Sequence, residues 1–155
     1  MNHSKLDELN ACREAVEWYE SFDTLQEAWD KCERGDWMLW YLGRTCGPPD
    51  TADHRTMTAC KAACARLVLH IYEAKYPNDV RPRNAIEAAE EYSRGEITAY
   101  SAYSDADAYS AAAAAAYSAY SAYSAAAYSA DAYSAARFAM LKQCAEEIRK
   151  IVPTI

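Results

Sequence analysis

The feature that most constrains this chain is a run of 39 residues, 98–136, made almost entirely of alanine, tyrosine and serine. Nineteen of them are alanine, the strongest helix former, so the run predicts helix with closely approaching backbones. Tyrosines, each followed by serine, are its large contact groups: Tyr100, Tyr103, Tyr109, Tyr117, Tyr120, Tyr123, Tyr128 and Tyr133. Tyrosine offers a large contact area with a polar tip, so we regard these side chains as a candidate binding surface.

This alanine-rich run is too long to be one helix on a compact domain. An unbroken helix over 96–151 would extend about 80 Å, roughly twice the width of such a domain. Serine and aspartate are good helix caps, so we expect breaks at 104–107 and 129–131. The tyrosines do not follow one stripe, and they could equally fill the interior of a helical pair. Disorder is the less favoured alternative, because alanine is abundant.

Length and charge limit the classes of protein. A chain of 155 residues fits one domain, which we divide into a helical core (1–97), the Ala-Tyr-Ser segment (98–136) and a closing helix (137–155). The formal charge is −7, and residues 1–36 alone contain ten acids and four bases. Nucleic acid is therefore not an expected partner, whereas a basic protein and a small ligand both stay open as alternatives.

The six cysteines could suggest disulfides, but the start of the chain favours a reducing compartment. The chain begins with polar residues rather than the apolar core of a signal peptide, so we expect free thiols and a cytoplasmic protein. No run of 18 strongly apolar residues occurs, and a membrane span is not expected.

Capping residues and apolar spacing predict an all-α, single-domain bundle of six or seven helices. Thr24 with Glu27 forms a capping box, Gly35 is placed to end that helix, and Asp36 and Asp53 are suited to begin the next two. Gly95 closes a further helix. The expected helices are 4–20, 24–35, 36–42, 53–75, 82–92 and 131–152, with additional helix in the Ala-Tyr-Ser segment.

No residue pattern indicates catalysis. Cys60 and Cys64, with His54 and His70 nearby, could suggest zinc, but both cysteines continue an apolar helix face and we interpret them as core residues. We therefore predict no enzyme activity, no cofactor and no metal. The arginines near predicted helix ends favour ion pairs, with an anion pocket as the alternative. Three of them join the candidate binding surface: Arg81, Arg83 and Arg94.

Several motifs together resemble a known family. They are Ala11–Ala15 with Trp18, Ala28–Trp40, Cys60 with Ala63–Leu67, and Arg81–Arg83 leading into 85–90 and 94–96. In order and spacing they are similar to the fifth-group-like family of bacterial immunity proteins, whose relatives are also carried by phages. The resemblance implies an all-helical, non-enzymatic protein that neutralises a toxin. It also implies a core signature: Trp29, Trp37, Trp40, Cys60 and Cys64.

Three functions follow as hypotheses. The first is an inhibitor that binds a protein target, a toxin or a defence component, stoichiometrically. The second is a protein that sequesters an anionic small ligand such as a signalling nucleotide, in the manner of phage counter-defence. The third is self-assembly into a homo-oligomer through the alanine-rich helices.

Overall fold

A computed structural model describes residues 5–104 and 130–155, apart from the side chains of 103–104 and 130–133. These residues form eight helices and no strand. The helices are α1 (Lys5–Glu8), α2 (Arg13–Tyr19), α3 (Leu25–Lys31), α4 (Gly35–Thr45), α5 (Ala52–Lys75), α6 (Arg81–Arg94), α7 (Ala99–Ser104) and α9 (Ala130–Ile151). The all-α, single-domain prediction is confirmed, with one helix more than the upper expected number.

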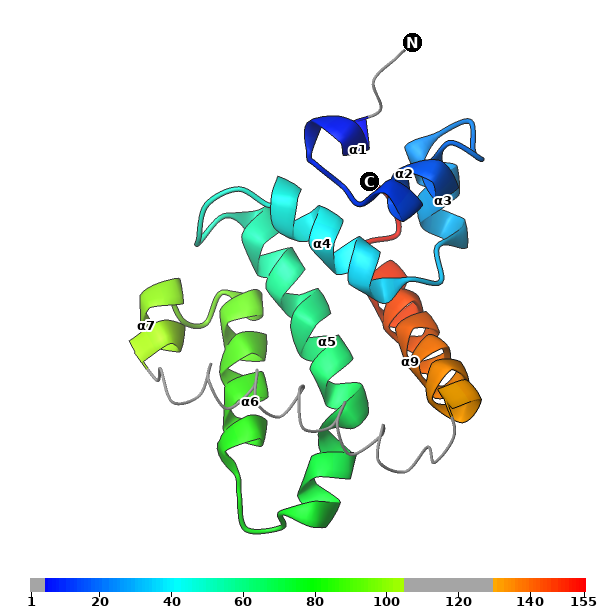
Figure 1. The fold of residues 1–155 in the computed structure, drawn as a ribbon. Helices are drawn as coiled ribbons and strands as arrows, with labels where there is room; N and C mark the ends of the chain where they lie inside the picture. Colours follow the sequence, from blue (N-terminus) through cyan, green and yellow to red (C-terminus); the bar gives the residue numbers. More distant parts are fainter. Residues whose placement is uncertain (1–4, 105–129) are drawn as a thin grey trace.

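The long helix α5 is the axis of the bundle. Helix α6 lies antiparallel on one side of it, α9 lies on the other side, and α4 crosses its upper end (Figure 1). The short helices α1, α2 and α3 lie above α4, and α7 lies beside the end of α6 (Figure 1). The bundle therefore has a lower part, α5 to α9, and an upper layer of short helices that rests on α4.

The expected helix over 4–20 is instead two helices. Asn10 adopts a left-handed conformation with φ of 60°, and helix α2 begins only at Arg13. Asparagine tolerates this conformation better than most residues, so it can end a helix as glycine does. The apolar spacing of this region is continuous, which is why it predicted one helix.

Glycine 35 has a different role from the one its position suggested. Helix α3 begins as predicted, with the Thr24 hydroxyl accepting from the Glu27 backbone N–H at 3.1 Å, but it ends at Lys31. Gly35 is the first residue of α4, so Asp36 is not its cap. A Cβ at Gly35 would lie 2.5 Å from the Cβ of Cys144, so glycine is needed for the approach of α4 to α9.

The other boundaries agree more closely with prediction. Helix α5 ends at Lys75 as expected. Its N-terminus is capped by the hydroxyl of Thr51, which accepts from the His54 N–H, and not by Asp53. Helix α6 carries Pro82 in its first turn, and Gly95 ends it with φ of 79°. Helix α9 begins and ends within one residue of the predicted 131–152. The breaks expected at 104–107 and 129–131 fall mainly on residues 105–129, which lie outside the described residues.

The core forms where α4, α5 and α9 meet. Cys60 on α5 and both Ala145 and Ile148 on α9 are 0% exposed. The buried residues of this cluster are Leu6, Trp29, Cys32, Met38, Tyr41, Cys60, Cys64, Ala145 and Ile148. A smaller cluster joins α5 to α6 beside the ion pair between Arg66 and Glu90, 2.7 Å apart. Helices α4 and α9 thus hold the upper layer to the lower part.

A buried tyrosine connects the loop before α5 to the end of α6. The hydroxyl of Tyr92 accepts from the Asp50 N–H at 2.8 Å and lies 2.9 Å from Nδ1 of His54. The Arg55 guanidinium donates to the Tyr92 carbonyl at 2.5 Å and pairs with Asp50 at 3.1 Å. Asp50 also accepts from the N–H of Ala99, the first residue of α7. These contacts position the start of the Ala-Tyr-Ser segment.

The burial of Cys60 predicts a loss of stability at alkaline pH. Burial raises the pKa of the Cys60 thiol to about 11, whereas an unfolded cysteine has a pKa of about 8.5. Between these values the unfolded thiol loses its proton and the folded thiol keeps it, so the free energy of unfolding falls as pH rises. In urea titrations between pH 8 and 10, Cys60→Ala should lose about 2 kcal/mol less stability than the unsubstituted chain. The exposed Cys12 is the matched control, and an equal effect of Cys12→Ala and Cys60→Ala would contradict this assignment.

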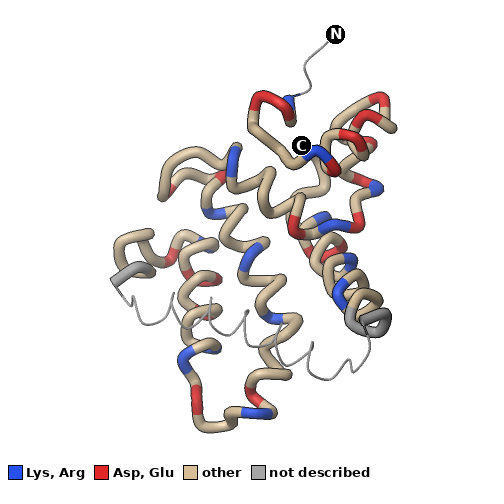
Figure 2. Tube along the Cα trace, viewed as in Figure 1, with Lys and Arg blue, Asp and Glu red and all other residues tan. Residues whose placement is uncertain are grey.

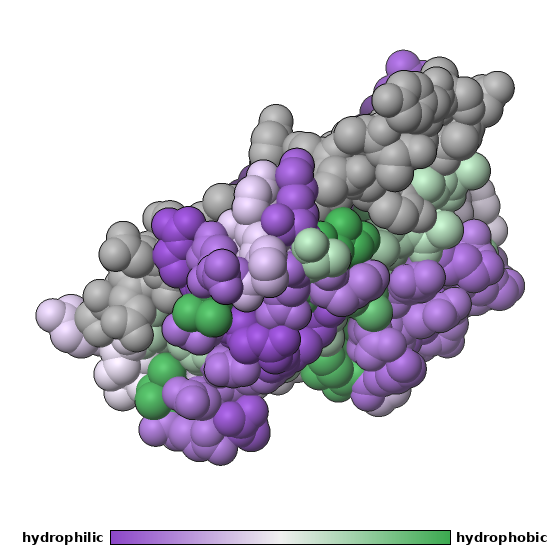
Figure 3. Space-filling view, turned by 90° about the horizontal axis from the view of Figure 1, so that it is seen from below, coloured by the Kyte–Doolittle hydropathy of each residue, from purple (hydrophilic) through white to green (hydrophobic). Residues whose placement is uncertain are grey.

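The hydrophobic residues on the lower face of the molecule do not form one continuous surface. Seen from below, hydrophobic residues appear as separate patches among hydrophilic ones (Figure 3). The large apolar side chains exposed in the described parts of the chain include Val80 and Phe138, at 55% and 59%. None of the described helices is both long and apolar enough to cross a membrane.

Candidate functional site

Most of the predicted tyrosine surface lies outside the described residues. Tyr100 on α7 is 83% exposed. Tyr103 and Tyr133 lie in α7 and α9, but their side chains are not described. The remaining tyrosines of the candidate surface fall within 105–129: Tyr109, Tyr117, Tyr120, Tyr123 and Tyr128. The tyrosine surface therefore stays a prediction.

The three candidate arginines each pair with a carboxylate. Arg81 donates two hydrogen bonds to Asp79, at 2.8 and 2.7 Å, and holds the pKa of that carboxyl well below its usual range. Arg83 binds Glu73 in the same two-pronged way, with both distances 2.8 Å. Arg94, at the opposite end of α6, binds Glu96. Each guanidinium fork already holds an anion, which is the geometry of ion pairs rather than of one shared anion pocket.

The signature residues of the resemblance divide into two groups. Trp29, Cys60 and Cys64 are buried, at 4%, 0% and 9% exposure. Trp37 and Trp40 are only half-buried. His54 is engaged with Tyr92 and His70 is exposed, and no three metal-ligating side chains gather within residues 5–104 or 130–155.

An apolar pocket of about 260 Å³ lies between the upper layer and α4. Short helices α1, α2 and α3 contribute one wall and α4 contributes the other. The pocket is lined by Leu6, Ala11, Cys12, Ala15, Trp18, Tyr19, Leu25, Ala28, Trp29, Cys32, Asp36, Trp37, Met38, Trp40 and Tyr41. We call it the N-terminal pocket. All four tryptophans of the chain line it.

Aromatic contacts fix the walls of the N-terminal pocket. The rings of Trp18 on α2 and Trp37 on α4 have centroids 6.0 Å apart, and those of Trp29 and Tyr41 meet edge to face at 6.2 Å. The Trp29 indole N–H donates to the carbonyl of Val152 at 2.9 Å. Large rings joined in pairs keep the helices apart, and the space that remains between them is the pocket.

The end of α9 supports the floor of the pocket. The Arg149 guanidinium donates to the carbonyl of Cys32 at 2.5 Å and to that of Trp29 at 3.4 Å. Both carbonyls lie at the end of α3, where helix carbonyls commonly need partners from outside the helix. The Gln26 amide also binds the chain end, donating to Pro153 and accepting from Ile155. The upper layer is thus tied to the C-terminus at several points.

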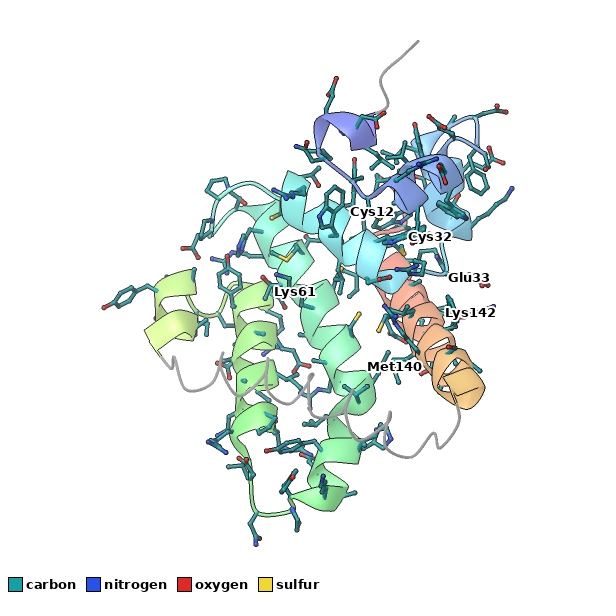
Figure 4. All side chains as sticks on the ribbon, in the orientation of Figure 1. Cys12, Cys32, Glu33, Lys61, Met140 and Lys142 are labelled. Carbon is teal, nitrogen blue, oxygen red and sulfur yellow. The ribbon has the colours of Figure 1, made fainter. Side chains whose placement is uncertain are left out.

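The charged group of the pocket is already paired. The carboxylate of Asp36 accepts two hydrogen bonds from Arg34, at 2.8 and 2.7 Å, and the Arg34 guanidinium lies 4.3 Å from the centre of the Trp37 ring. Burial acts to raise the pKa of Asp36, but the hydrogen bonds and charge of Arg34 outweigh it, and the pKa lies below its ordinary value. Burial raises the pKa of the Cys32 thiol. Figure 4 shows Cys32 and the exposed Cys12 near each other beside α4.

The pocket is covered by the most acidic part of the chain. Residues 5–36 hold ten acids and four bases, a net charge of −6, whereas the remainder holds thirteen acids and twelve bases. Acidic residues predominate over α2 and α3, and both signs are mixed along α5 and α6 (Figure 2). On the outer side of α9, Lys142 pairs with Glu33 at 2.6 Å (Figure 4). We call α1 to α3 with their loops the acidic roof.

Sequence reasoning did not find this pocket. It predicted a helix over 36–42, but it did not indicate that Trp37 and Trp40 would be only half-buried. The available signal was that every tryptophan falls within 18–40, the same stretch that holds the excess of acids. Tryptophan is enriched at protein interfaces, so its concentration in this stretch is a signal for a contact surface.

These features define a small all-helical protein with an apolar pocket. The chain belongs to the family described as "Imm-5 like putative immunity protein", whose sequence model matches residues 48–140. This confirms the resemblance seen in the sequence. The match begins after α4, so the N-terminal pocket and the motifs within 11–40 lie outside it. Comparisons with curated proteins and with solved structures found no match.

Proposed function

We propose that this chain is a non-enzymatic immunity protein that acts by binding one protein target, a toxin or a defence component, in a fixed ratio. Membership of the immunity-protein family is the observation that carries the proposal. An inhibitor of this kind needs a contact surface with exposed aromatic groups and a charge suited to its target. Half-buried tryptophans beneath an acidic roof supply both.

The cytoplasm is the compartment we propose. All six cysteines are free, and four of them are buried: Cys32, Cys46, Cys60 and Cys64. Free thiols are typical of proteins that work in a reducing environment. The target would then be met inside the cell.

The two other hypotheses receive less support. Sequestration of an anion would need guanidinium groups that are not already bound, but Arg81, Arg83 and Arg94 each hold a carboxylate. Self-assembly through the alanine-rich segment remains a prediction, and light scattering on the intact chain measures it directly.

The proposal is tested by recovering the target. The tagged chain is purified from the cells in which it occurs, and the bound protein is identified and then expressed alone or with the chain in a second host. We expect growth arrest by the target alone, normal growth with the chain, and a complex of constant stoichiometry. The mass of the released target should be unchanged. Protection at a small fraction of the target's concentration, or a covalently altered target, would instead show an enzyme.

A further inference from the structure

We propose that the N-terminal pocket and the acidic roof together receive an amphipathic segment of a basic protein partner. A large apolar side chain of that segment enters the pocket, and its lysines or arginines lie against the roof. This inference rests on the proposed function, since it assumes that the partner is a protein, and it assigns the surface that binds it.

The size of the pocket suits side chains better than a larger ligand. Its volume of about 260 Å³ lies below the roughly 300–1,000 Å³ of typical sites for small molecules and cofactors. Its mouth is bordered by residues that are not fully buried, among them Trp18, Trp37 and Trp40. One or two apolar side chains from a docked segment can therefore reach it.

The chemistry of the pocket favours an apolar occupant. The Trp29 indole N–H is bound to Val152, and the Asp36 carboxylate is bound to Arg34. Among the described residues, every buried side-chain nitrogen and oxygen has a hydrogen-bond partner. A polar ligand would lose its bonds to water here and find few replacements, whereas an apolar side chain loses nothing by entering.

The charge around the pocket favours a basic occupant. Residues 5–34, which form the acidic roof, hold nine acids and four bases, a net charge of −5 out of the chain's formal charge of −7. The carboxylates of the roof include Glu14 and Glu20 on and beside α2, and neither forms an ion pair with another described residue. Such a field attracts a basic partner and speeds its approach. A second copy of this chain is a poorer occupant, because two acidic roofs repel each other.

Tryptophan fluorescence can test the proposal, because all four tryptophans line the pocket. The probe is a peptide of about 14 residues without aromatic residues, with leucine at helical spacing and lysine elsewhere. One control peptide has the same composition with scattered leucines, and another has glutamate in place of lysine. We expect saturable 1:1 binding of the first peptide with a spectral change, and at least about tenfold weaker binding of both controls.

Matched variants locate the binding site. Ala11→Phe, at the edge of the pocket, should weaken binding at least about tenfold, whereas Ala74→Phe on the exposed end of α5 should not. Replacing Glu14 and Glu20 with glutamine should weaken binding more than the same change at the exposed Glu91 and Glu146.

Chemical modification of the folded chain is a second way to obstruct the pocket, and it does not require a variant to fold. N-ethylmaleimide on the exposed Cys12, which lines the pocket, should abolish peptide binding in the folded chain and should not affect the Cys12→Ser variant.

Three results would overturn the inference. They are equal binding of the glutamate peptide, unchanged binding by Ala11→Phe or after modification of Cys12, and saturation of the fluorescence by free indole with no peptide binding. The proposed function fails separately, when the unsubstituted chain forms no complex with a recovered target. If that complex forms and Ala11→Phe leaves it intact, the function stands and the assignment of this surface is wrong.

Discussion

Substitution of Gly35 by alanine is expected to destabilise the protein by about 3 kcal/mol or more, the largest effect we foresee for adding one methyl group. The added Cβ would lie 2.5 Å from the Cβ of Cys144, 2.9 Å from the N of Ala145 and 2.9 Å from the carbonyl oxygen of Leu141. The last two are backbone atoms of α9, which cannot move aside by a change of rotamer. Helices α4 and α9 would have to separate. The floor of the pocket, which the end of α9 supports, would move with α9.

Gly43 in the same helix is the matched control. A Cβ at Gly43 would meet nothing within 4 Å, and the residue is exposed. Alanine there should stabilise the chain by about 0.5–1 kcal/mol, because glycine is a poor helix former. Urea unfolding followed by circular dichroism measures both variants. A free energy of unfolding for Gly35→Ala within about 0.5 kcal/mol of the original chain would show that α4 does not approach α9 this closely.

Replacement of Trp29 by alanine is expected to cost about 3–5 kcal/mol. The side chain is 4% exposed and belongs to the main core, and its indole N–H binds the Val152 carbonyl. Trp29→Phe keeps most of the apolar contact and loses the hydrogen bond, so it should cost about 1–2 kcal/mol. Circular dichroism is the suitable measure, because tryptophan fluorescence itself changes in these variants.

Trp40 provides the control for Trp29. It lines the same pocket but is half-buried, so Trp40→Ala should cost clearly less than Trp29→Ala. Equal costs for the two substitutions would mean that Trp29 is not the anchor between α3 and the chain end.

The sequence predicted helix boundaries well where residues close in the chain determine them. The Thr24 cap and the end of α6 at Gly95 each need only neighbouring residues, and both were predicted. Gly35 was misinterpreted because its reason lies on α9, more than a hundred residues away. A glycine that permits close packing and a glycine that ends a helix cannot be told apart from their neighbours alone.

The pocket could not be predicted for a related reason. It is a space left between helices, and its size depends on how rings such as Trp18 and Trp37 meet across two helices. Apolar spacing indicates which residues turn inward but not whether they fill the interior. The acidic excess of the N-terminal region was evident from composition, and it now has a location over the pocket.

Two surfaces are thus candidates for contact with the partner: the Ala-Tyr-Ser segment and the N-terminal pocket. The Ala-Tyr-Ser segment remains a predicted surface, and of its tyrosines the structure describes only the side chain of Tyr100. The N-terminal pocket rests on described contacts, volume and charge. Both fit an immunity protein, and they make different predictions about which amides a bound target protects.

Hydrogen–deuterium exchange on the chain alone and in complex with its recovered target compares these surfaces in one experiment. Our account predicts the strongest additional protection in peptides from 11–41, which include the lining of the pocket from Ala11 to Tyr41. Protection confined to 98–136, with 11–41 unchanged, would contradict it and assign recognition to the tyrosine-rich segment instead.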